Sequence, residues 1–431
     1  MNVLKYTDKN FLRRLSKLSN ATPLFDDIID RSVRGILKSV RNDGDQALLR
    51  FAKKFDNVTM SKEDLRVTGT ELRIATRSVG KNVAGALKFA HSNIETFHRK
   101  GLRKGWSGKN AQGAIVGEKY DSFGRVGIYI PGGTAPLVST ALMTITLAGV
   151  AGCREICVCT PPEADGSVNN DLLYACQMAG ASEVYKVGGA QAIAAMAYGT
   201  RRIHRVQKIF GPGNAYVVAA KRLLFGQVAI DLLPGPSELL VIADDSGKPK
   251  SIAADLLAQA EHGSGHERCW LVTPSGKLLR AVKREIQKQL PTLSRNRFIK
   301  LALKQNGWLI QVKDLNDAVD LANKLAPEHC EVMAGGSRRL VEKIVTAGAI
   351  FVGPWSPTVL GDYVAGPSHT LPTGGAGRSF SGLTVDQFQR RTSVVEYSKS
   401  ALKKSMAIVE KMAIMEGLDG HGRSAAIRLE K

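Results

Sequence analysis

Hydrophobic residues recur at spacings of three and four through much of the first 120 residues, which is the period of an amphipathic helix. The stretch TPLFDDIIDRSVRGILKSVRNDGDQALLRFAKKF, residues 22–55, carries this pattern, with Thr and Asp near its starts and Gly44 as a break. We expect this part of the chain to form a layer of helices.

The pattern changes at about residue 125 to short runs of β-branched residues that end in Gly and Pro. Helical stretches of the length that crossover connections need separate several of these runs, so we predict a mostly parallel α/β sheet. Ligands of such sheets bind beyond the carboxyl ends of the strands. The runs are GRVGIYIPGG, EICVCTPP, EVYKVGG, VQKIFGPG and AIDLLPGPSELLVIAD.

A second set of strands follows in the carboxyl-terminal half, again alternating with helical patterns. Its strands are CWLVTP, GWLIQV, CEVMAG and GAIFVGP. Two α/β units of similar pattern predict two Rossmann-like, mostly parallel domains. The end of the chain reads as helical again, from about Val385 to Leu418.

Length and composition fit this picture. A chain of 431 residues, 44% hydrophobic and 23% charged, is long enough for two or more domains of about 100–200 residues each. No apolar run reaches the ~18 residues that a membrane span needs. Lys5, Asp8 and Lys9 precede any apolar stretch, which argues against a secretory signal. We expect a cytoplasmic protein with no membrane partner.

The formal net charge of +21 raises the question of a nucleic-acid partner, because clustered Lys and Arg neutralise phosphates. The densest basic patch is FHRKGLRKGWSGK, residues 97–109, which also holds Trp106. Basic residues nevertheless recur along the whole chain. We therefore favour a solvated basic surface and expect no nucleic-acid partner.

The six cysteines are too few for a disulfide framework in a chain of this size. Cys157 and Cys159 share a face of a predicted strand, and Cys153 lies close by in AGCREICVCTPP. This arrangement suits buried thiols better than metal binding.

Three Gly-rich turns follow predicted strands. GPGNAY (211–216) opens a helical run, so its backbone N–H groups could face an anion. Alone it is a weak signal, since it lacks the third glycine of the dinucleotide fingerprint. YIPGG (129–133) and GGAQ (188–191) are similar turns. Three such turns on one sheet edge indicate a cleft for an extended cofactor.

Candidate metal ligands occur at three places. Gln259 and His262 lie three apart in LLAQAEHG, before a glycine that can end a helix, so both side chains share a helix face. Asp362 lies in a Gly- and Pro-rich loop with His369, and Glu416 and His421 end the last helix. Spacing alone cannot bring these residues together, and on spacing alone we favour surface or capping roles for each.

LAPEHC places Glu328 beside His329. A Glu and a His can both be tuned toward neutral pH for proton transfer. The alternative is an ordinary turn before a strand. Adjacent residues face different ways in a regular element, so joint action requires an irregular backbone here.

Eight motifs, in order from about residue 25 to the carboxyl terminus, together resemble the histidinol dehydrogenase family. That family oxidises L-histidinol to L-histidine through L-histidinaldehyde, with two NAD⁺ in succession at one zinc site, as the last steps of histidine biosynthesis. The motifs are YIPGGTAPL, GGAQAIA, FGPGNAY, DLLPGPSE, LLAQAEHG, LAPEH, GDYVAGPSHTLPT and EGLDGHG.

The resemblance implies roles for the residues singled out above. His329 is the expected base for the alcohol proton, and Glu328 is expected to activate the water that hydrates the aldehyde. No cysteine thioester is needed, so Cys330 is expected to be dispensable. The expected zinc ligands, one ion per subunit, are Gln259, His262, Asp362 and His421. A mixed N/O site of this kind also accepts manganese or cobalt.

The same resemblance assigns contacts to substrate and cofactor. The expected substrate contacts are Ser237, Gln259, His262, His329, Asp362, Glu416 and His421. The expected NAD contacts are Tyr129, Gln191 and Asn214, one on each Gly-rich turn. His369 is expected either to shape its loop or to touch substrate.

The resemblance also implies a domain division and a homodimer. Residues 1–24 would form a helical extension, 25–128 and 239–383 the α/β domain with the zinc and catalytic residues, and 129–238 the α/β domain with the NAD contacts. Residues 384–431 would form a carboxyl-terminal helical extension that completes the partner's active site. The helical extensions would serve dimerisation.

One segment departs from the family pattern. After AEHG the family usually has residues rich in Pro, Asp, Ser and Gln, whereas this chain has SGHERCWLVTP, residues 264–274. His266, Glu267 and Arg268 therefore lie where other residues are usual, close to the expected metal.

Three other hypotheses stay open from the sequence. The nearest is a related zinc and NAD dehydrogenase that oxidises another small polar alcohol, such as a sulfonated diol. A zinc hydrolase would use a metal and a glutamate base but would not need three Gly-rich turns. A nucleic-acid-binding protein is least favoured.

Overall fold

The computed structural model describes residues 1–18, 26–132 and 136–430 of the chain. One of its sheets has six strands, all parallel, in the order β1-β11-β10-β9-β12-β13. Every residue of the central β9 is buried, as expected for a parallel strand covered by helices on both faces. The strands are β1 (Asn2–Lys5), β9 (Glu238–Ala243), β10 (Arg268–Thr273), β11 (Gly307–Gln311), β12 (His329–Met333) and β13 (Ala349–Val352).

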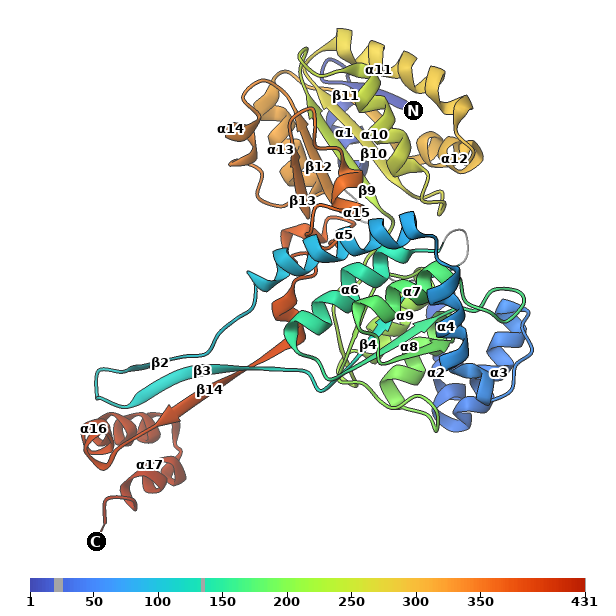
Figure 1. Cartoon of the computed structure of the whole chain (residues 1–431). Helices are drawn as coiled ribbons and strands as arrows, with labels where there is room; N and C mark the ends of the chain where they lie inside the picture. The colour runs from blue at the N-terminus through green and yellow to red at the C-terminus, as the bar shows by residue number, and fades with distance from the viewer. Residues whose placement is uncertain (19–25, 133–135, 431) are drawn as a thin grey trace.

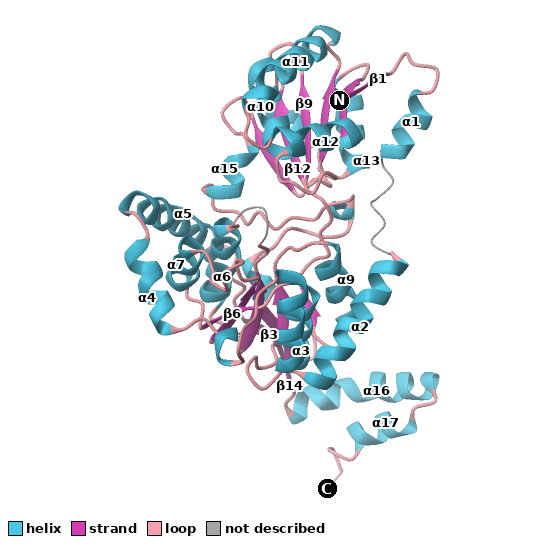
Figure 2. Cartoon of the chain, turned by 90° about the vertical axis from the view of Figure 1, so that its right-hand side faces the viewer, coloured by secondary structure: helices cyan, strands magenta, loops and turns pink. Residues whose placement is uncertain are grey.

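Helices cover both faces of the six-stranded sheet (Figure 2), and each face has its own apolar core. One face packs against α10 (Pro249–Ala260), α11 (Gly276–Gln289) and α12 (Asn296–Asn306). The other packs against α1 (Phe11–Leu18), α13 (Leu315–Leu325) and α14 (Ser337–Val341). The short α15 (Thr358–Tyr363) follows β13 and contacts α10.

The second α/β unit has a five-stranded parallel sheet in the order β6-β5-β4-β7-β8. Its strands are β4 (Arg125–Tyr129), β5 (Glu155–Thr160), β6 (Glu183–Lys186), β7 (Lys208–Phe210) and β8 (Ala229–Ile230). Helices α6 (Val138–Ala151) and α7 (Asn170–Ala179) cover one face, and α8 (Gly189–Tyr198) and α9 (Ala215–Leu224) cover the other. The prediction of mostly parallel α/β structure is confirmed.

The predicted amino-terminal helical layer is present, and it packs on the five-stranded unit. Helices α2 (Asp27–Asp43) and α3 (Asp45–Phe51) contact α8, while α4 (Gly69–Ser78) packs on α7 and α5 (Lys81–Arg99) packs on α6. The division expected from the sequence grouped residues 25–128 with the six-stranded sheet instead. The buried side chains of these helices join the cores of α6–α9, which explains the difference.

The first residues also differ from the sequence expectation. The extension over residues 1–24 was expected to be helical, but residues 2–5 form β1, which pairs with β11. Only α1 within this stretch is helical among the described residues. Short helical turns elsewhere are Ala52–Asp56, Glu63–Leu65, Leu290–Thr292, Ala376–Arg378 and Val385–Phe388.

An extended arm carries the carboxyl terminus away from both sheets (Figure 1). Its base is an antiparallel sheet of β14 (Gln389–Glu396), β3 (Ile115–Ser122) and β2 (Trp106–Lys109). Helices α16 (Lys399–Glu416) and α17 (Asp419–Ala426) lie at its end. The helix expected to start at about Val385 therefore begins only at Lys399, because the β14 residues pair along their whole length with β3.

The two parallel sheets face each other through the ends of their strands. The chain leaves β8 at Ile230 and begins β9 at Glu238, so the carboxyl edge of the five-stranded sheet lies next to the amino edge of the six-stranded sheet. Figure 2 shows the loops that fill the space between them. None of the described helices has the length and apolar character required to span a membrane.

Candidate active site

Glu328 and His329 stand at the amino end of β12, where the backbone is irregular. Ala326, which ends α13, has a left-handed conformation (φ 48°) that is uncommon for a residue other than glycine. Both side chains reach the first residue of β9: Glu328 Oε2 accepts the Glu238 N–H at 2.8 Å, and His329 Nδ1 lies 3.1 Å from the Glu238 carbonyl oxygen. The two neighbouring side chains therefore lie together, with 3.7 Å between His329 Nδ1 and Glu328 Oε2.

Burial shifts the two groups in opposite directions. It raises the pKa of Glu328 well above its ordinary value, with a further contribution from the charge of Glu238, while the Ser237 hydroxyl opposes the shift by hydrogen bonding. Burial lowers the pKa of His329, against the attraction of Asp362. A neutral His329 that donates Nδ1–H to Glu238 presents a free Nε2 lone pair, as a general base requires.

Asp362 lies at the other side of His329. Its Oδ1 is 3.8 Å from His329 Nε2, and its backbone oxygen is 3.2 Å from Nδ1 of His369. The ring of His369 also contacts Thr140 of α6, at 3.3 Å from Nε2 to the hydroxyl oxygen. Ser368 donates to the Met143 carbonyl at 3.1 Å. This loop thus joins the two α/β units, and the contacts of His369 are those of a residue that shapes it.

Gln259 and His262 come together at the end of α10, beside the same cluster. His262 Nδ1 lies 2.9 Å from the Gln259 carbonyl oxygen and 3.3 Å from its side-chain nitrogen. An Nδ1–H donated to that carbonyl leaves the Nε2 lone pair of His262 for another partner. The charge of His262 contributes to the lowered pKa of both His329 and His369, which places all three imidazoles in one region.

The residues of this cluster fit a divalent metal in their chemistry. An amide oxygen, a carboxylate and an imidazole are available from Gln259, Asp362 and His262, and a mixed N/O set of this kind suits zinc. Across residues 1–18, 26–132 and 136–430, no group of three or more His, Cys, Asp or Glu side chains forms a metal site. Two of the four expected ligands, His262 and Asp362, are His or Asp residues within the cluster. Gln259 is an amide, and His421 lies elsewhere in the chain.

His421 and Glu416 are not part of this cluster in the single chain. Both are exposed, and both lie on the arm: Glu416 ends α16 and His421 is in α17. His421 lines a hollow of about 540 Å³ whose other walls also come from the arm, including Tyr397, Leu402 and Arg428. The chain by itself therefore holds three of the four expected ligands in one region.

The three Gly-rich turns lie together at the carboxyl edge of the five-stranded sheet. Tyr129 ends β4, and its hydroxyl accepts the Gly189 N–H at 3.0 Å. Gln191 is buried in the first turn of α8. Asn214 caps α9 through its side-chain oxygen. A Cβ on Gly211 would lie 2.1 Å from the Tyr129 carbonyl oxygen, so only glycine permits this approach. Gly133, in the first of these turns, lies outside the described residues.

A fully buried ion pair holds the GPGNAY turn. Lys221 of α9 pairs with Asp231, and neither side chain is exposed. Asp231 Oδ2 accepts the Gly211 N–H at 2.8 Å, and Lys221 Nζ donates to the Gly211 carbonyl at 3.0 Å. The N–H and the carbonyl group of Gly211 are therefore both bonded to this ion pair.

The candidate residues occupy opposite edges of the two sheets. The expected NAD contacts follow the carboxyl ends of strands, as the sequence rule predicts. Glu328, His329 and Ser237 instead precede β12 and β9, at the amino edge of the six-stranded sheet. These three candidate residues therefore lie at the opposite ends of their strands from those that the rule for carboxyl ends predicts. Gln259 and Asp362 reach the same edge because α10 and α15 run back along the sheet.

Sequence reasoning missed two acidic groups behind the cluster. Burial raises the pKa of Glu238 to about 7, although Arg268 lies 3.1 Å from its Oε1. Glu331 is completely buried on β12. A charged residue inside an apolar strand pattern, as in PSELLVIA and HCEVM, was the available signal. Arg268 belongs to the unusual SGHERCW segment and places a cation beside Glu238. The backbone of Glu238 is the partner of both Glu328 and His329.

The six cysteines all lie inside the protein. All six are free and buried, which confirms the prediction for Cys153, Cys157 and Cys159. Burial raises the pKa of Cys330, next to His329, to about 12. A thiol in that state is a poor nucleophile at neutral pH.

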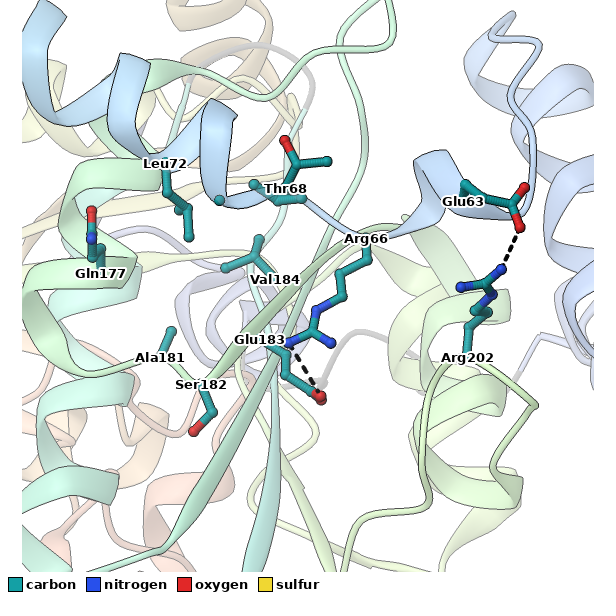
Figure 3. Close-up of a pocket in the computed structure, with 12 residues that line it drawn as sticks. Glu63, Arg66, Thr68, Leu72, Gln177, Ala181, Ser182, Glu183, Val184 and Arg202 are labelled. Carbon is teal, nitrogen blue, oxygen red and sulfur yellow. Dashed lines mark hydrogen bonds and ion pairs between the residues drawn. The ribbon is translucent and has the colours of Figure 1, made fainter.

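A separate hollow of about 450 Å³ lies beside β6 and the start of α4 (Figure 3). Its two arginines are paired with acids, Arg66 with Glu183 at 3.6 Å and Arg202 with Glu63. It contains none of the expected catalytic, metal or NAD residues, and we assign it no role in the chemistry.

Comparisons with known proteins agree with this architecture. The family model described as histidinol dehydrogenase matches residues 22–429. A histidinol dehydrogenase from a Synechococcus species is 44% identical over 97% of this chain and 98% of its own length, and one from Heliobacterium mobile is 45% identical over 93% of each. The crystal structure of histidinol dehydrogenase from Elizabethkingia anophelis superposes with a TM-score of 0.94, at 35% identity, over 100% of this chain and 98% of that one.

Two parallel α/β units with a buried Glu and His pair between them, in a chain with these relatives, make the protein an enzyme of the dehydrogenase class. The identity and coverage are high enough to be specific. The chain belongs to the histidinol dehydrogenase family.

Proposed function

We propose that this protein oxidises L-histidinol to L-histidine through L-histidinaldehyde, using two NAD⁺ and one zinc ion per subunit. The observation that carries the proposal is the convergence of Glu328, His329 and Asp362 at one sheet edge, facing the Gly-rich turns of the other sheet. The family relationship supports the substrate.

Gln259, His262 and Asp362 would hold the zinc ion together with His421 of a second copy. A zinc ion bound there supplies Lewis acidity toward the substrate hydroxyl and an anchor for the substrate imidazole and amine. Glu416 of the second copy would pair with the substrate ammonium. Ser237, which hydrogen-bonds Glu328 at the rim of β9, completes the expected substrate contacts.

His329 would take the alcohol proton at Nε2. Its Nδ1 is held by the Glu238 carbonyl, which fixes the tautomer, and burial keeps the ring neutral and ready to accept a proton. NAD⁺, when bound, would supply the hydride acceptor for each of the two oxidations. The 3.8 Å distance to Asp362 favours the imidazolium once the proton has moved.

Glu328 would act in the second oxidation as the base for water. Its carboxyl is buried and its pKa is raised, so it can accept a proton near neutral pH, where an ordinary carboxylate is a weak base. Hydration of the aldehyde gives a diol from which the second hydride can leave. The inert Cys330 thiol agrees with a route that needs no thioester.

Tyr129, Gln191 and Asn214 would bind NAD through the turns that they organise. Tyr129 and Gln191 are buried, so we assign them to the shape of the turns, whereas Asn214 is exposed at the start of α9. The N-terminus of α9 would favour a phosphate through the helix dipole, while Asn214 Oδ1 accepts the Tyr216 and Val217 N–H groups.

We further propose a homodimer in which each arm completes the site of the other copy. Large apolar side chains are exposed along the arm, as expected for a surface that a partner covers. These residues are Val394, Val395, Ile408, Met412, Ile414, Met415 and Ile427. A second copy would both cover this surface and deliver His421 and Glu416.

The test is the number of NADH molecules formed per histidinol by the purified dimer, before and after a chelator. We expect two NADH per substrate, loss of activity with the metal, and recovery with zinc. A sulfonated diol and related polar alcohols belong in the same assay. If one of these alcohols strongly outcompetes histidinol, the substrate assignment fails. The hypothesis of a related dehydrogenase for another small polar alcohol then replaces it.

A further inference from the structure

Two acidic side chains meet inside the six-stranded unit, one layer beneath the candidate active site. Asp255 lies on α10 and is 8% exposed, and Glu331 lies on β12 and is 0% exposed. Each carboxyl group shifts the pKa of the other, and Asp255 Oδ2 and Glu331 Oε2 are both buried without another hydrogen-bond partner. Neither residue is among the expected ligands, bases or substrate contacts.

A proton is required between them. If both groups were carboxylates, Asp255 Oδ2 and Glu331 Oε2 would be buried oxygens without a hydrogen-bond donor. Two carboxylates in contact also repel each other, so one of the pair holds a proton. Consistently, burial raises the pKa of Asp255 to about 6 and that of Glu331 well above its ordinary value.

The pair connects the elements that carry the site. Asp255 lies one helical turn before Gln259 on α10. Glu331 and His329 are two residues apart on β12, so their side chains point to the same face of the sheet. That face is the one that α10 covers.

The third element is α15, which carries Asp362. Glu331 Oε1 accepts the N–H of Thr358, the first residue of α15, at 2.9 Å. Glu331 therefore binds α15 with Oε1, and its Oε2 is left for Asp255 of α10. Figure 1 shows α15 at the lower end of the six-stranded unit, and α15 contacts α10.

We propose that Asp255 and Glu331 form a proton-sharing clamp that positions Gln259, His329 and Asp362 relative to one another. The clamp acts on the metal and the base through the backbone of α10, β12 and α15. This role rests on the proposed function, because it assumes that Gln259 and Asp362 hold zinc.

The test compares substitutions that keep the hydrogen bond with substitutions that remove it. Asp255→Asn and Glu331→Gln keep a donor between the side chains, whereas Asp255→Ala and Glu331→Ala do not. Zinc affinity is measured by competition with a chromophoric chelator, and kcat and KM are measured with histidinol. We expect the alanine variants to bind zinc about 10- to 100-fold more weakly, as loss of an outer support typically does. We expect the amide variants to stay within about threefold of the parent.

Hydrogen exchange of the metal-free protein separates failure of the clamp from failure of the proposed function. The alanine variants should exchange faster at the amino end of α15 and the carboxyl end of α10, and the amide variants should not. Asp320→Ala, an exposed acid on α13, is the control. Unchanged exchange and zinc affinity in Asp255→Ala would overturn the clamp. Normal zinc binding and clamp behaviour without histidinol oxidation would overturn the substrate instead.

Discussion

His329 Nε2 lies 3.8 Å from Asp362 Oδ1, although the two residues belong to different elements and are separated by 33 positions. The contact joins the proposed proton acceptor to a proposed metal ligand. In the proposed mechanism, a proton accepted at Nε2 would be stabilised by the same carboxylate that would bind the metal. A mutation of His329 should therefore remove the base and leave the metal bound, whereas a mutation of Asp362 should affect both.

Replacement of His329 by Asn should remove the base and leave the metal ligands. We expect kcat for histidinol oxidation to fall by about 10²- to 10⁴-fold, with zinc bound in the same stoichiometry as in the parent. His266→Asn is the control, because His266 is exposed in the neighbouring loop. Loss of zinc together with activity in His329→Asn would instead make His329 a ligand.

Glu328→Gln should separate the two oxidations. The substituted amide keeps the shape of Glu328 and can still accept the Glu238 N–H, but it cannot activate water. We expect oxidation of histidinol to the aldehyde to persist and oxidation of histidinaldehyde to slow by about 10²-fold or more. Single-turnover NADH formation from each substrate, with a trap for free aldehyde, checks this. Equal loss of both steps would contradict the assignment.

Several features of the fold were predictable because they depend on local pattern. Apolar runs such as EICVCT and CWLVTP are long enough to define buried parallel strands, and the structure confirms them as β5 and β10. The β14 strand was not predictable, because most of its residues are exposed and its pairing with β3 spans more than 250 residues of sequence. Its stability comes from a distant partner.

The site follows the same division. The contact between Gln259 and His262 is local to one helix end and was expected from their spacing. The approach of His329 to Asp362, and the support of both by Glu331, depends on how three elements pack. No periodicity encodes that packing, so only the resemblance to a family could bring those residues together beforehand.

Lys221→Met should loosen the GPGNAY turn. Asp231 would be left buried without its cation, which typically costs about 3–5 kcal/mol of folding free energy. We expect that loss in chemical denaturation, together with weaker NAD binding. Arg202→Met removes an exposed pair with Glu63 and should cost less than about 1 kcal/mol. Similar losses in both variants would show that the buried pair has no special role.

His98 should make the protein sensitive to mild acid. Burial lowers its pKa from 6.5 to about 4, so between these values the unfolded chain binds a proton that the folded chain does not. Stability from this residue is present above pH 6.5 and is lost as the pH falls. We expect about 2 kcal/mol less stability at pH 5 than at pH 7.5 from this group.

The check is urea unfolding of the parent and His98→Gln at both pH values. The variant should lose less stability on acidification than the parent by about that amount. Glu238 and Glu328 act in the opposite sense, since their raised pKa values favour the folded state as the pH falls. An identical pH response in parent and variant would rule out the His98 contribution.

Mixing two inactive variants should restore activity if the arms cross between copies. His329→Asn removes the base from the part of the site next to β12. His421→Ala removes the proposed ligand that the arm would bring to the partner's site. A hybrid dimer then has one site with both defects and one intact site. After exchange of subunits at equal amounts, we expect about one quarter of the parent activity. No recovery, with hybrid dimers verified by mass, would place His421 in its own chain's site.

The pairing of β1 with β11 has a consequence for biosynthesis of the chain. β1 is translated before β11, and this neighbour in the sheet lies more than 300 residues further along the chain. The unit built from residues 27–230 has nearly all of its core by the time β8 emerges, and can fold as the chain is made. β1 must wait for β11, so the strand of this sheet that is made before the others can pair only after more than half of the chain has followed it.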